Sequence, residues 1–192
     1  MNQNLTEIVF ILDRSGSMSG LEADTIGGFN GFVKKQASLG QTSLTTILFD
    51  NHYEILHDHI DAQKAFLNEE TYFTRGNTAL LDAVGKTINN IGRRLMETTE
   101  GERPGKVIFV IITDGLENSS RKFTYSDVKG MIKHQSEKYG WEFIFLGANI
   151  DVCEEGDRLG ICADLVCEYE TTPYGIHDMY CMAAEICADI RV

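Results

Sequence analysis

The chain has 192 residues, and 43% of them are hydrophobic, which is the size and composition of one ordinary globular domain. Its 17 Lys and Arg residues and 29 Asp and Glu residues give a formal net charge of −12, which opposes general binding to nucleic acid or to an anionic membrane. The longest apolar stretches, such as 107–112, are far shorter than the ~20 residues that span a bilayer. We therefore expect one domain over residues 1–192, with neither nucleic acid nor a membrane as its partner.

The first half of the chain predicts a buried strand, a helix and an edge hairpin. Residues 8–12 are apolar without alternation, which is typical of a parallel strand that is covered on both faces. Apolar residues then recur at helical spacing over 26–37. Residues 44–49 and 53–60 flank a turn-forming Asp-Asn pair, so we expect them to form an antiparallel hairpin at a sheet edge.

The second half alternates helical and strand patterns. Residues 80–95 place one apolar stripe along a helix, and residues 107–112 and 143–146 repeat the apolar strand pattern. Thr172 and Pro173 predict the N-cap and first turn of a last helix. The alternation predicts an α/β fold: a doubly wound, Rossmann-like, mostly parallel sheet with one antiparallel edge strand and helices on both faces. Its ligand site is expected at the carboxyl ends of the strands.

The N-terminus lacks the marks of a secretory signal. Residues 1–7 contain no basic segment, and the apolar run after them leads into Asp13 rather than into a small-residue cleavage site. The five cysteines are odd in number, form no Cys-x-x-Cys pair and lie in the last quarter of the chain: Cys153, Cys162, Cys167, Cys181 and Cys187. We expect a cytoplasmic protein with reduced and mostly buried thiols.

Oxygen-bearing side chains cluster where the strands are expected to end. Asp13, Ser15 and Ser17 follow the first strand, Asp114 follows a later buried strand, and Thr78 precedes a long helix. A site of oxygen ligands alone suits Mg²⁺, Mn²⁺ or Ca²⁺. Ser, Gly and Asp after a strand also make an ordinary turn and helix cap. Three separate segments in a consistent order favour the metal site over that interpretation.

These residues resemble the metal-ion-dependent adhesion site of the von Willebrand factor A (vWA) domain family, which combines Asp-x-Ser-x-Ser, a threonine and a Thr-Asp-Gly-like segment. Asp13, Ser15 and Ser17 match the first motif, Thr78 matches the threonine, and Asp114 matches the aspartate. The resemblance implies a stand-alone intracellular module of bacterial or phage type with all five metal positions filled. In the family, the hydroxyls contact the metal directly or exchange with water, and the aspartates often act through waters.

The resemblance implies a protein-binding module rather than an enzyme. A Mg²⁺ or Mn²⁺ ion touched by few charged groups stays electrophilic, so that a Glu or Asp carboxylate of a partner would complete its coordination. Intracellular bacterial relatives often work beside AAA+ ATPases or in metal and stress responses, which implies a partner of that kind. The choice between Mg²⁺, Mn²⁺ and Ca²⁺ stays open, because all three accept oxygen ligands.

Two further hypotheses concern the same edge of the sheet. The alternative function is a metal-dependent hydrolase acting on a phosphoester, with Asp13 as nucleophile or metal ligand. Position 15 is a serine where a second carboxylate would have supported it, and no general-acid motif is evident. The second is a locally basic rim that steers acidic partners, since the loops of this edge contain Arg14, Arg75, Arg121 and Lys122. The alternative is that these side chains are solvated or pair with Glu117 and other carboxylates.

Overall fold

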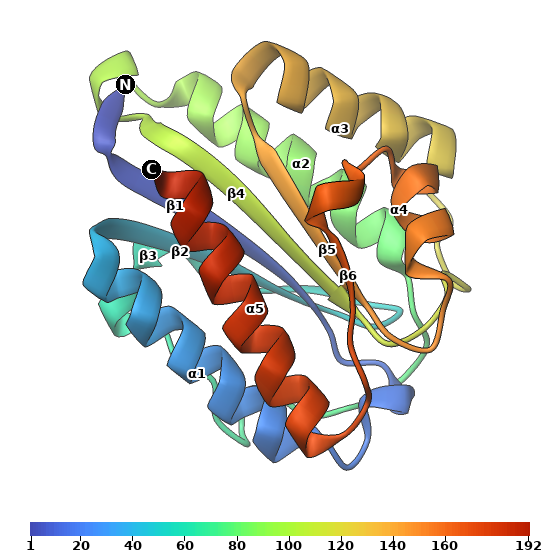
Figure 1. Ribbon diagram of the computed structural model, residues 1–192. Coiled ribbons are helices and arrows are strands. Elements are labelled where there is room, and N and C mark those ends of the chain that lie inside the picture. The colour runs from blue at the N-terminus through green and yellow to red at the C-terminus, as the bar shows by residue number, and fades with distance from the viewer.

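A six-stranded sheet separates two layers of helices in the computed structural model, which describes residues 1–192 (Figure 1). The sheet has the order β3-β2-β1-β4-β5-β6, and its strands are β1 (Asn2–Asp13), β2 (Gln41–Phe49), β3 (Tyr53–Asp61), β4 (Pro104–Thr113), β5 (Glu142–Gly147) and β6 (Val166–Glu168). Every pairing is parallel except that of β2 with the edge strand β3. The predicted mostly parallel α/β sheet with one antiparallel edge strand is confirmed.

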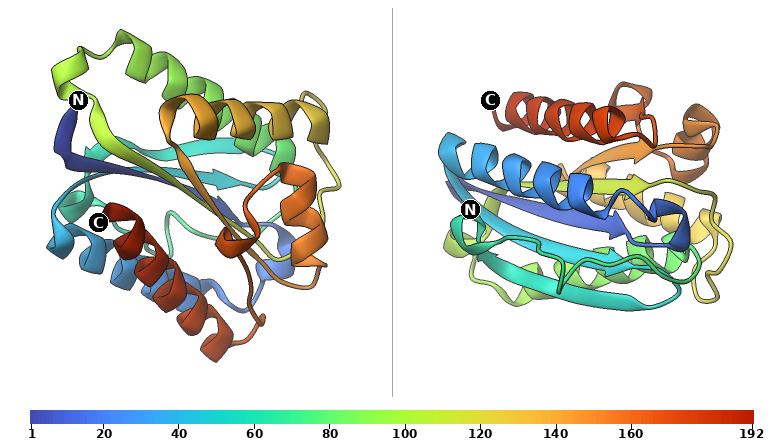
Figure 2. Two further views of the ribbon diagram at one scale, coloured as in Figure 1. Left: turned by 45° about the horizontal axis from the view of Figure 1, so that its top comes forward. Right: turned by 90° about the horizontal axis from the view of Figure 1, so that it is seen from below.

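The helices divide between the two faces of the sheet (Figures 1 and 2). One face is covered by α1 (Glu22–Leu39) and α5 (Pro173–Arg191), and the other by α2 (Leu80–Glu97), α3 (Tyr125–Tyr139) and α4 (Val152–Leu159). None of these helices is both long and apolar enough to cross a membrane. Successive side chains of a strand point to opposite faces. Phe10 of β1 therefore lies in the core under α1 and α5, while Val9 and Ile11 lie in the core under α2 and α3.

Capping residues set the start of two helices. Thr172 accepts a hydrogen bond from the Gly175 N–H (3.0 Å) and Pro173 occupies the first turn of α5, as predicted. At α3, Thr124 and Asp127 form a capping box in which each side chain accepts from the other residue's backbone N–H (3.2 and 2.8 Å). The apolar pattern did not predict α3, because its fully buried positions are only Val128 and Ile132.

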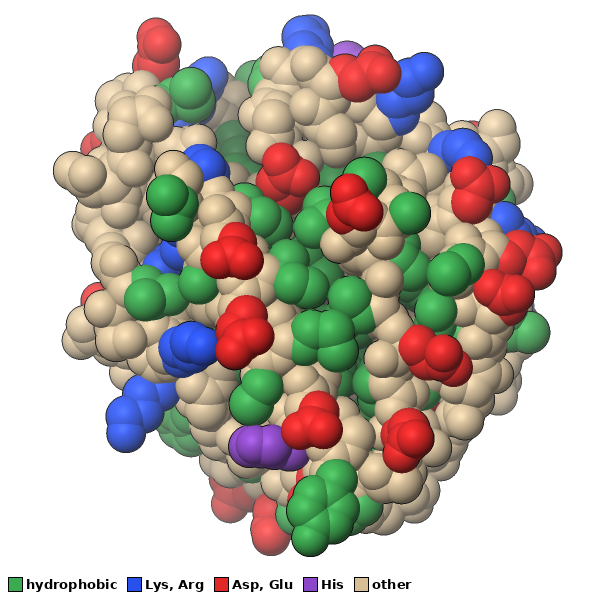
Figure 3. All heavy atoms as spheres, in the orientation of Figure 1, with side chains coloured by type: hydrophobic (Ala, Val, Ile, Leu, Met, Phe, Trp, Pro, Cys, Tyr) green, Lys and Arg blue, Asp and Glu red, His purple; other side chains and the backbone are tan.

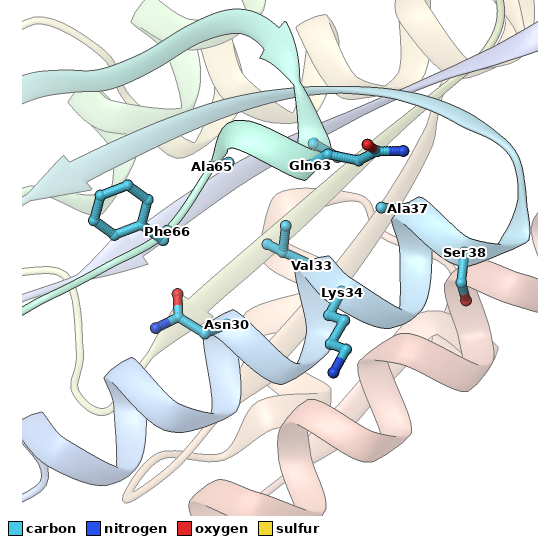
Figure 4. A pocket seen from close by; sticks show the side chains of 9 residues that line it. Asn30, Val33, Lys34, Ala37, Ser38, Gln63, Ala65 and Phe66 are labelled. Carbon is cyan, nitrogen blue, oxygen red and sulfur yellow. The ribbon is translucent and has the colours of Figure 1, made fainter.

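The long connection from β3 to α2 is fastened to α1 and to the end of β1. Figure 4 shows Asn30 and Val33 of α1 facing the segment of Ala65 and Phe66 across a cavity of about 420 Å³. The Asn30 amide donates to the Leu67 carbonyl (2.9 Å) and accepts from the Leu67 N–H (2.8 Å). These bonds hold the connection against α1 on its way to the loop that precedes α2.

The thiols are more exposed than predicted. All five cysteines are free, Cys187 is buried and Cys167 is partly buried, but Cys153, Cys162 and Cys181 are exposed. The prediction of mostly buried thiols was wrong because Cys153 lies on the outer side of α4 and Cys162 in a surface turn. Six residues of α-helix correspond to about 600° of rotation, so Cys181 and Cys187 lie on different faces of α5. Burial raises the pKa of the Cys187 thiol to about 12.

Gly28 sets the approach of α1 to α5. A Cβ at Gly28 would lie 2.2 Å from Tyr180 Cδ2, and Tyr180 is fixed in the core at 3% exposure. We expect Gly28→Ala to lower the free energy of unfolding by ~1–3 kcal/mol in urea titrations, because the two helices must separate. Gly27→Ala is the matched control: nothing lies within 4 Å of its added Cβ, so stability should stay equal or rise by about 0.5–1 kcal/mol. Equal losses from the two substitutions would contradict this packing.

Candidate metal centre

The loops that follow β1 and precede α2 are joined at the carboxyl edge of the sheet. The Arg75 N–H donates to the Arg14 carbonyl (2.8 Å), and the Gly16 N–H donates to the Gly76 carbonyl (3.2 Å). The Tyr72 hydroxyl donates to the Asp13 carbonyl (2.8 Å) from within the same connection. Segments about 60 residues apart in the chain are thereby held side by side, as the parallel sheet predicts for this edge.

Three of the predicted ligands form a hydroxyl and carboxylate cluster. Ser17 Oγ donates to Asp114 Oδ1 (2.6 Å), and Ser15 Oγ lies 3.1 Å from Ser17 Oγ and 3.5 Å from Asp114 Oδ1. Ser15 stands at the N-cap of the short 3₁₀ turn Gly16–Met18, yet its side chain makes no capping hydrogen bond. The interpretation of this segment as an ordinary helix cap is therefore wrong for Ser15, whose hydroxyl faces the other polar groups.

Asp13 is completely buried at the end of the central strand. Its Oδ1 accepts from the Ser15 N–H (2.7 Å), and its Oδ2 accepts from Thr113 Oγ1 (2.7 Å). Burial raises the pKa of Asp13 to about 6, against the lowering effect of these hydrogen bonds and with a further rise from the charge of Asp114. Hydrogen bonds to both carboxylate oxygens thus hold the Asp13 side chain in one orientation.

Thr78 faces the same space from the loop before α2. Its N–H donates to Asn118 Oδ1 (3.0 Å) and its carbonyl accepts from the Asn118 N–H (3.0 Å), while its hydroxyl makes no hydrogen bond. A Cβ built on Gly115 would lie 3.9 Å from Thr78 Oγ1 and 4.0 Å from Ser17 Oγ. The two hydroxyls therefore converge beside Gly115, and the structure brings all five predicted residues to one place.

This donor set fits a hard divalent cation. It offers two carboxylates and three hydroxyls, and such oxygen ligands suit Mg²⁺ and Mn²⁺. Asp114 Oδ2 is buried and has no hydrogen-bond partner, and burial raises the pKa of Asp114. An unpartnered buried carboxylate oxygen is costly unless a positive charge faces it. A cation between the serines, Thr78 and Asp114 would supply that charge.

The predicted basic rim is only partly present. Arg14 is completely buried, with its Nε on Asp50 Oδ2 (3.1 Å) and its Nη2 2.8 Å from Glu54 Oε2. Its assignment to the rim was wrong, because its backbone N–H still pairs with the Phe49 carbonyl of β2 (2.9 Å) and its side chain turns towards the end of that strand. Arg75 is 45% exposed but its Nε also donates to Asp50 Oδ2 (2.7 Å). The exposed cations of the rim are Arg75, Arg121 and Lys122.

Sequence reasoning missed the residues that support the cluster. Thr113 is one of them: its hydroxyl orients Asp13, and its carbonyl accepts from Tyr169 Oη (3.2 Å). Tyr72 and Tyr169 come from segments without a strong periodic pattern. The buried pairing of Arg14 with Asp50 was equally hidden, because it joins positions 36 residues apart.

Comparison with known proteins supports the fold but gives no sequence relative. No family model matches the chain, and no curated protein matches it. Among solved structures, proximal thread matrix protein 1 from the mussel byssus is 15% identical with a TM-score of 0.63, over 97% of this chain and 47% of that one. The PilB minor pilin of Streptococcus sanguinis is 13% identical with a TM-score of 0.68, over 99% and 63%. Manganese-loaded TRAP of Plasmodium vivax is 14% identical with a TM-score of 0.64, over 93% and 73%.

The chain has a vWA-type fold. One structure of the mussel protein, 14% identical to this chain, is described as having a zinc-occupied MIDAS motif, the abbreviation for the metal-ion-dependent adhesion site. The chain spans 47% of the mussel protein, which therefore has further parts that this chain does not match. At these identities the likeness establishes the fold of this chain and nothing of its ligands.

The buried Arg14–Asp50 pair makes a pH-dependent contribution to stability. Burial raises the pKa of Asp50, but hydrogen bonds from Arg75 and His52 and the charge of Arg14 outweigh it, so that the pKa lies below the ordinary value of 3.8. The ionised carboxylate therefore stabilises the fold above that pH, and its contribution is lost as the pH falls through the lowered pKa. We expect Asp50→Asn to cost up to about 3–5 kcal/mol near neutral pH, because it removes one of the two carboxylates that face the buried Arg14 guanidinium.

The measurement is urea unfolding of wild type and Asp50→Asn at neutral pH and at a pH below the Asp50 pKa. The difference between the two proteins should shrink at the acidic pH. Asp58→Asn is the control: Asp58 is exposed and forms no ion pair, so its substitution should change stability by less than about 0.5 kcal/mol. An Asp50→Asn effect of the same size at both pH values would contradict the assigned charge state.

Proposed function

We propose that this chain is a metal-dependent protein-binding module. Asp13, Ser15, Ser17, Thr78 and Asp114 would hold Mg²⁺ or Mn²⁺, and a Glu or Asp carboxylate of a protein partner would complete the coordination. The observation behind the proposal is the buried, unpartnered Asp114 Oδ2 beside converging hydroxyls. Most groups of the cluster are neutral hydroxyls. Its carboxylates would therefore attract a cation but leave that cation able to bind a further anion.

The protein groups around Asp13 explain how the site keeps affinity for a further anion. The Ser15 N–H and the Thr113 hydroxyl both donate to Asp13 and disperse its negative charge. A divalent cation would face at most two carboxylates, and no three His, Cys, Asp or Glu side chains of the chain are arranged to hold a metal ion. The bound ion would supply a positive charge that a partner's carboxylate can satisfy.

The solved structures support a divalent cation as the ligand of this site. Two of them are described with metals, one with a zinc-occupied MIDAS motif and one loaded with manganese. This chain presents oxygen ligands only, which favours Mg²⁺ or Mn²⁺ over zinc. An AAA+ ATPase or stress-response component as partner and a cytoplasmic location stay predictions from the resemblance, because no contact in the structure selects between partners.

We further propose that the site binds and does not catalyse. A nucleophile or general base needs an available lone pair and a pKa suited to its task. Both oxygens of Asp13 and the Oδ1 of Asp114 already accept hydrogen bonds, and the unpartnered Asp114 Oδ2 is the oxygen that would face the cation. No histidine or further carboxylate is hydrogen-bonded to these groups. Phosphoester hydrolysis, the alternative from the sequence, would also need a general acid, which these contacts do not supply.

Cation binding is tested first on the purified protein. We expect Mg²⁺ or Mn²⁺ at one hundred times its Kd to stabilise the wild type by about 2.7 kcal/mol in thermal or urea unfolding, with reversal by EDTA. Ser17→Ala and Asp114→Asn should abolish the stabilisation. Asp114→Asn should not destabilise the metal-free protein, since it removes an unpartnered buried charge. Ser19→Ala, an exposed serine two residues from Ser17, should behave like wild type.

Failure of the cation to stabilise the wild type, or equal stabilisation of Asp114→Asn, would contradict the proposed metal centre. Isothermal titration calorimetry gives the same comparison without unfolding the protein. A Zn²⁺ arm tests whether the same residues hold this ion, and Zn²⁺ binding that Ser17→Ala and Asp114→Asn retain would show that Zn²⁺ binds elsewhere.

Partner binding is tested by affinity capture from a native lysate in Mg²⁺ or Mn²⁺. We expect a partner that is retained by wild type and Ser19→Ala but lost with EDTA and with Ser17→Ala. Replacing individual Glu and Asp residues of that partner by Gln and Asn should identify one carboxylate whose loss equals the EDTA effect. If the cation binds but every captured protein is indifferent to EDTA, the binding-module proposal is wrong.

A further inference from the structure

A cavity of about 480 Å³ lies at the amino end of the sheet, opposite the candidate metal centre. It is formed where the C-terminal ends of α2 and α3 lie side by side near the start of β4 (Figure 2). Ile88, Val107 and Trp141 are buried side chains in its lining, and Met96 and Tyr139 are exposed ones. Its volume and its combination of apolar walls with a few polar groups are those of small-molecule sites in proteins.

The charge of the cavity is opposite to that of the chain. None of the 29 Asp and Glu residues lines it, whereas Arg93, Arg103 and His134 do. Arg103 is occupied, since it donates to the carbonyls of Thr98 (2.9 Å) and Met96 (3.2 Å). Arg93 is exposed and forms no ion pair, so its guanidinium is free to meet an anion. A planar guanidinium binds carboxylates in a bidentate manner.

The apolar region on the face that carries α5 lacks this combination. Figure 3 shows hydrophobic side chains gathered in the middle of the face that carries α5, and Asp and Glu side chains border them. A negative ligand would be repelled there. At the α2–α3 cavity the apolar surface and the free cation lie together, which selects a ligand with an apolar body and an anionic group.

Gly92 leaves one wall of the cavity open. Gly85 and Gly92 lie seven residues apart on one face of α2. A Cβ at Gly85 would be 2.6 Å from Phe123 Cδ1, so close packing accounts for that glycine. A Cβ at Gly92 would meet only Gln135 Nε2, at 3.9 Å. Glycine within a helix is unfavourable, and close packing does not account for it at Gly92. The effect of the missing side chain there is that the cavity stays open.

We propose that this cavity binds a small organic acid with an apolar body. The body lies against Trp141 and its apolar neighbours, and the carboxylate pairs with Arg93. The proposal does not depend on the metal centre, because β4 runs for 10 residues between the two sites, a separation of about 30 Å.

Octanoate is the probe, and Trp141 reports its binding because it is the single tryptophan of the chain. The titration follows tryptophan fluorescence, with calorimetry as the second readout, on the full chain without added metal. Octan-1-ol is the neutral comparison ligand. The variants are Arg93→Gln, Gly92→Leu and, as the matched control, Lys133→Gln, an exposed cation of α3 that does not line the cavity.

We expect octanoate to bind saturably and at least about tenfold more tightly than octan-1-ol, because hydrogen bonds to charged groups are stronger than those to neutral ones. For the same reason, Arg93→Gln should lower the affinity for octanoate by about tenfold. Lys133→Gln should bind like wild type. Gly92→Leu should keep or raise the melting temperature and abolish binding, because its side chain fills the cavity. Absence of saturable octanoate binding, equal binding of the alcohol, or unchanged affinity in Arg93→Gln would overturn the proposal.

Discussion

The organisation of the carboxyl edge depends on one buried carboxylate at the end of the central strand. Asp13 accepts from the Ser15 N–H and from the Thr113 hydroxyl, and its carbonyl accepts from Tyr72. Those three bonds connect the loop after β1, the end of β4 and the connection into α2. Because Asp13 has no exposed surface, losing any of these donors would leave a buried acceptor unpaired. The positions of the hydroxyls follow from this constraint.

Two buried aspartates near this edge have opposite electrostatic surroundings. Asp50 faces Arg14 and Arg75, and its pKa lies below the usual value. Asp114 faces hydroxyls only, its Oδ2 has no partner, and its pKa is raised by burial. The first arrangement is complete within the protein and stabilises the loops. The second is incomplete, and that difference explains why a cation is proposed at Asp114 and not at Asp50.

The two ends of the sheet offer contrasting chemistry. The carboxyl ends of the strands gather oxygen atoms, which suits a hard cation. At the amino ends, α2 and α3 leave a cavity with apolar walls and a free guanidinium, which suits an organic anion. The rigid sheet between them consists of apolar strands that are buried on both faces. Each site can therefore be altered by substitution without touching residues of the other.

The sequence by itself determined five of the six strands, three of the five helices and the identity of the candidate ligands. It did so because long apolar runs such as 107–112 and the local Asp13-x-Ser15-x-Ser17 spacing are properties of consecutive residues. Only the tertiary structure decided that Arg14 is buried on Asp50, that Cys181 faces solvent and that Gly92 borders a cavity. These outcomes depend on which side chains from distant segments meet, and no pattern within one segment contains that information.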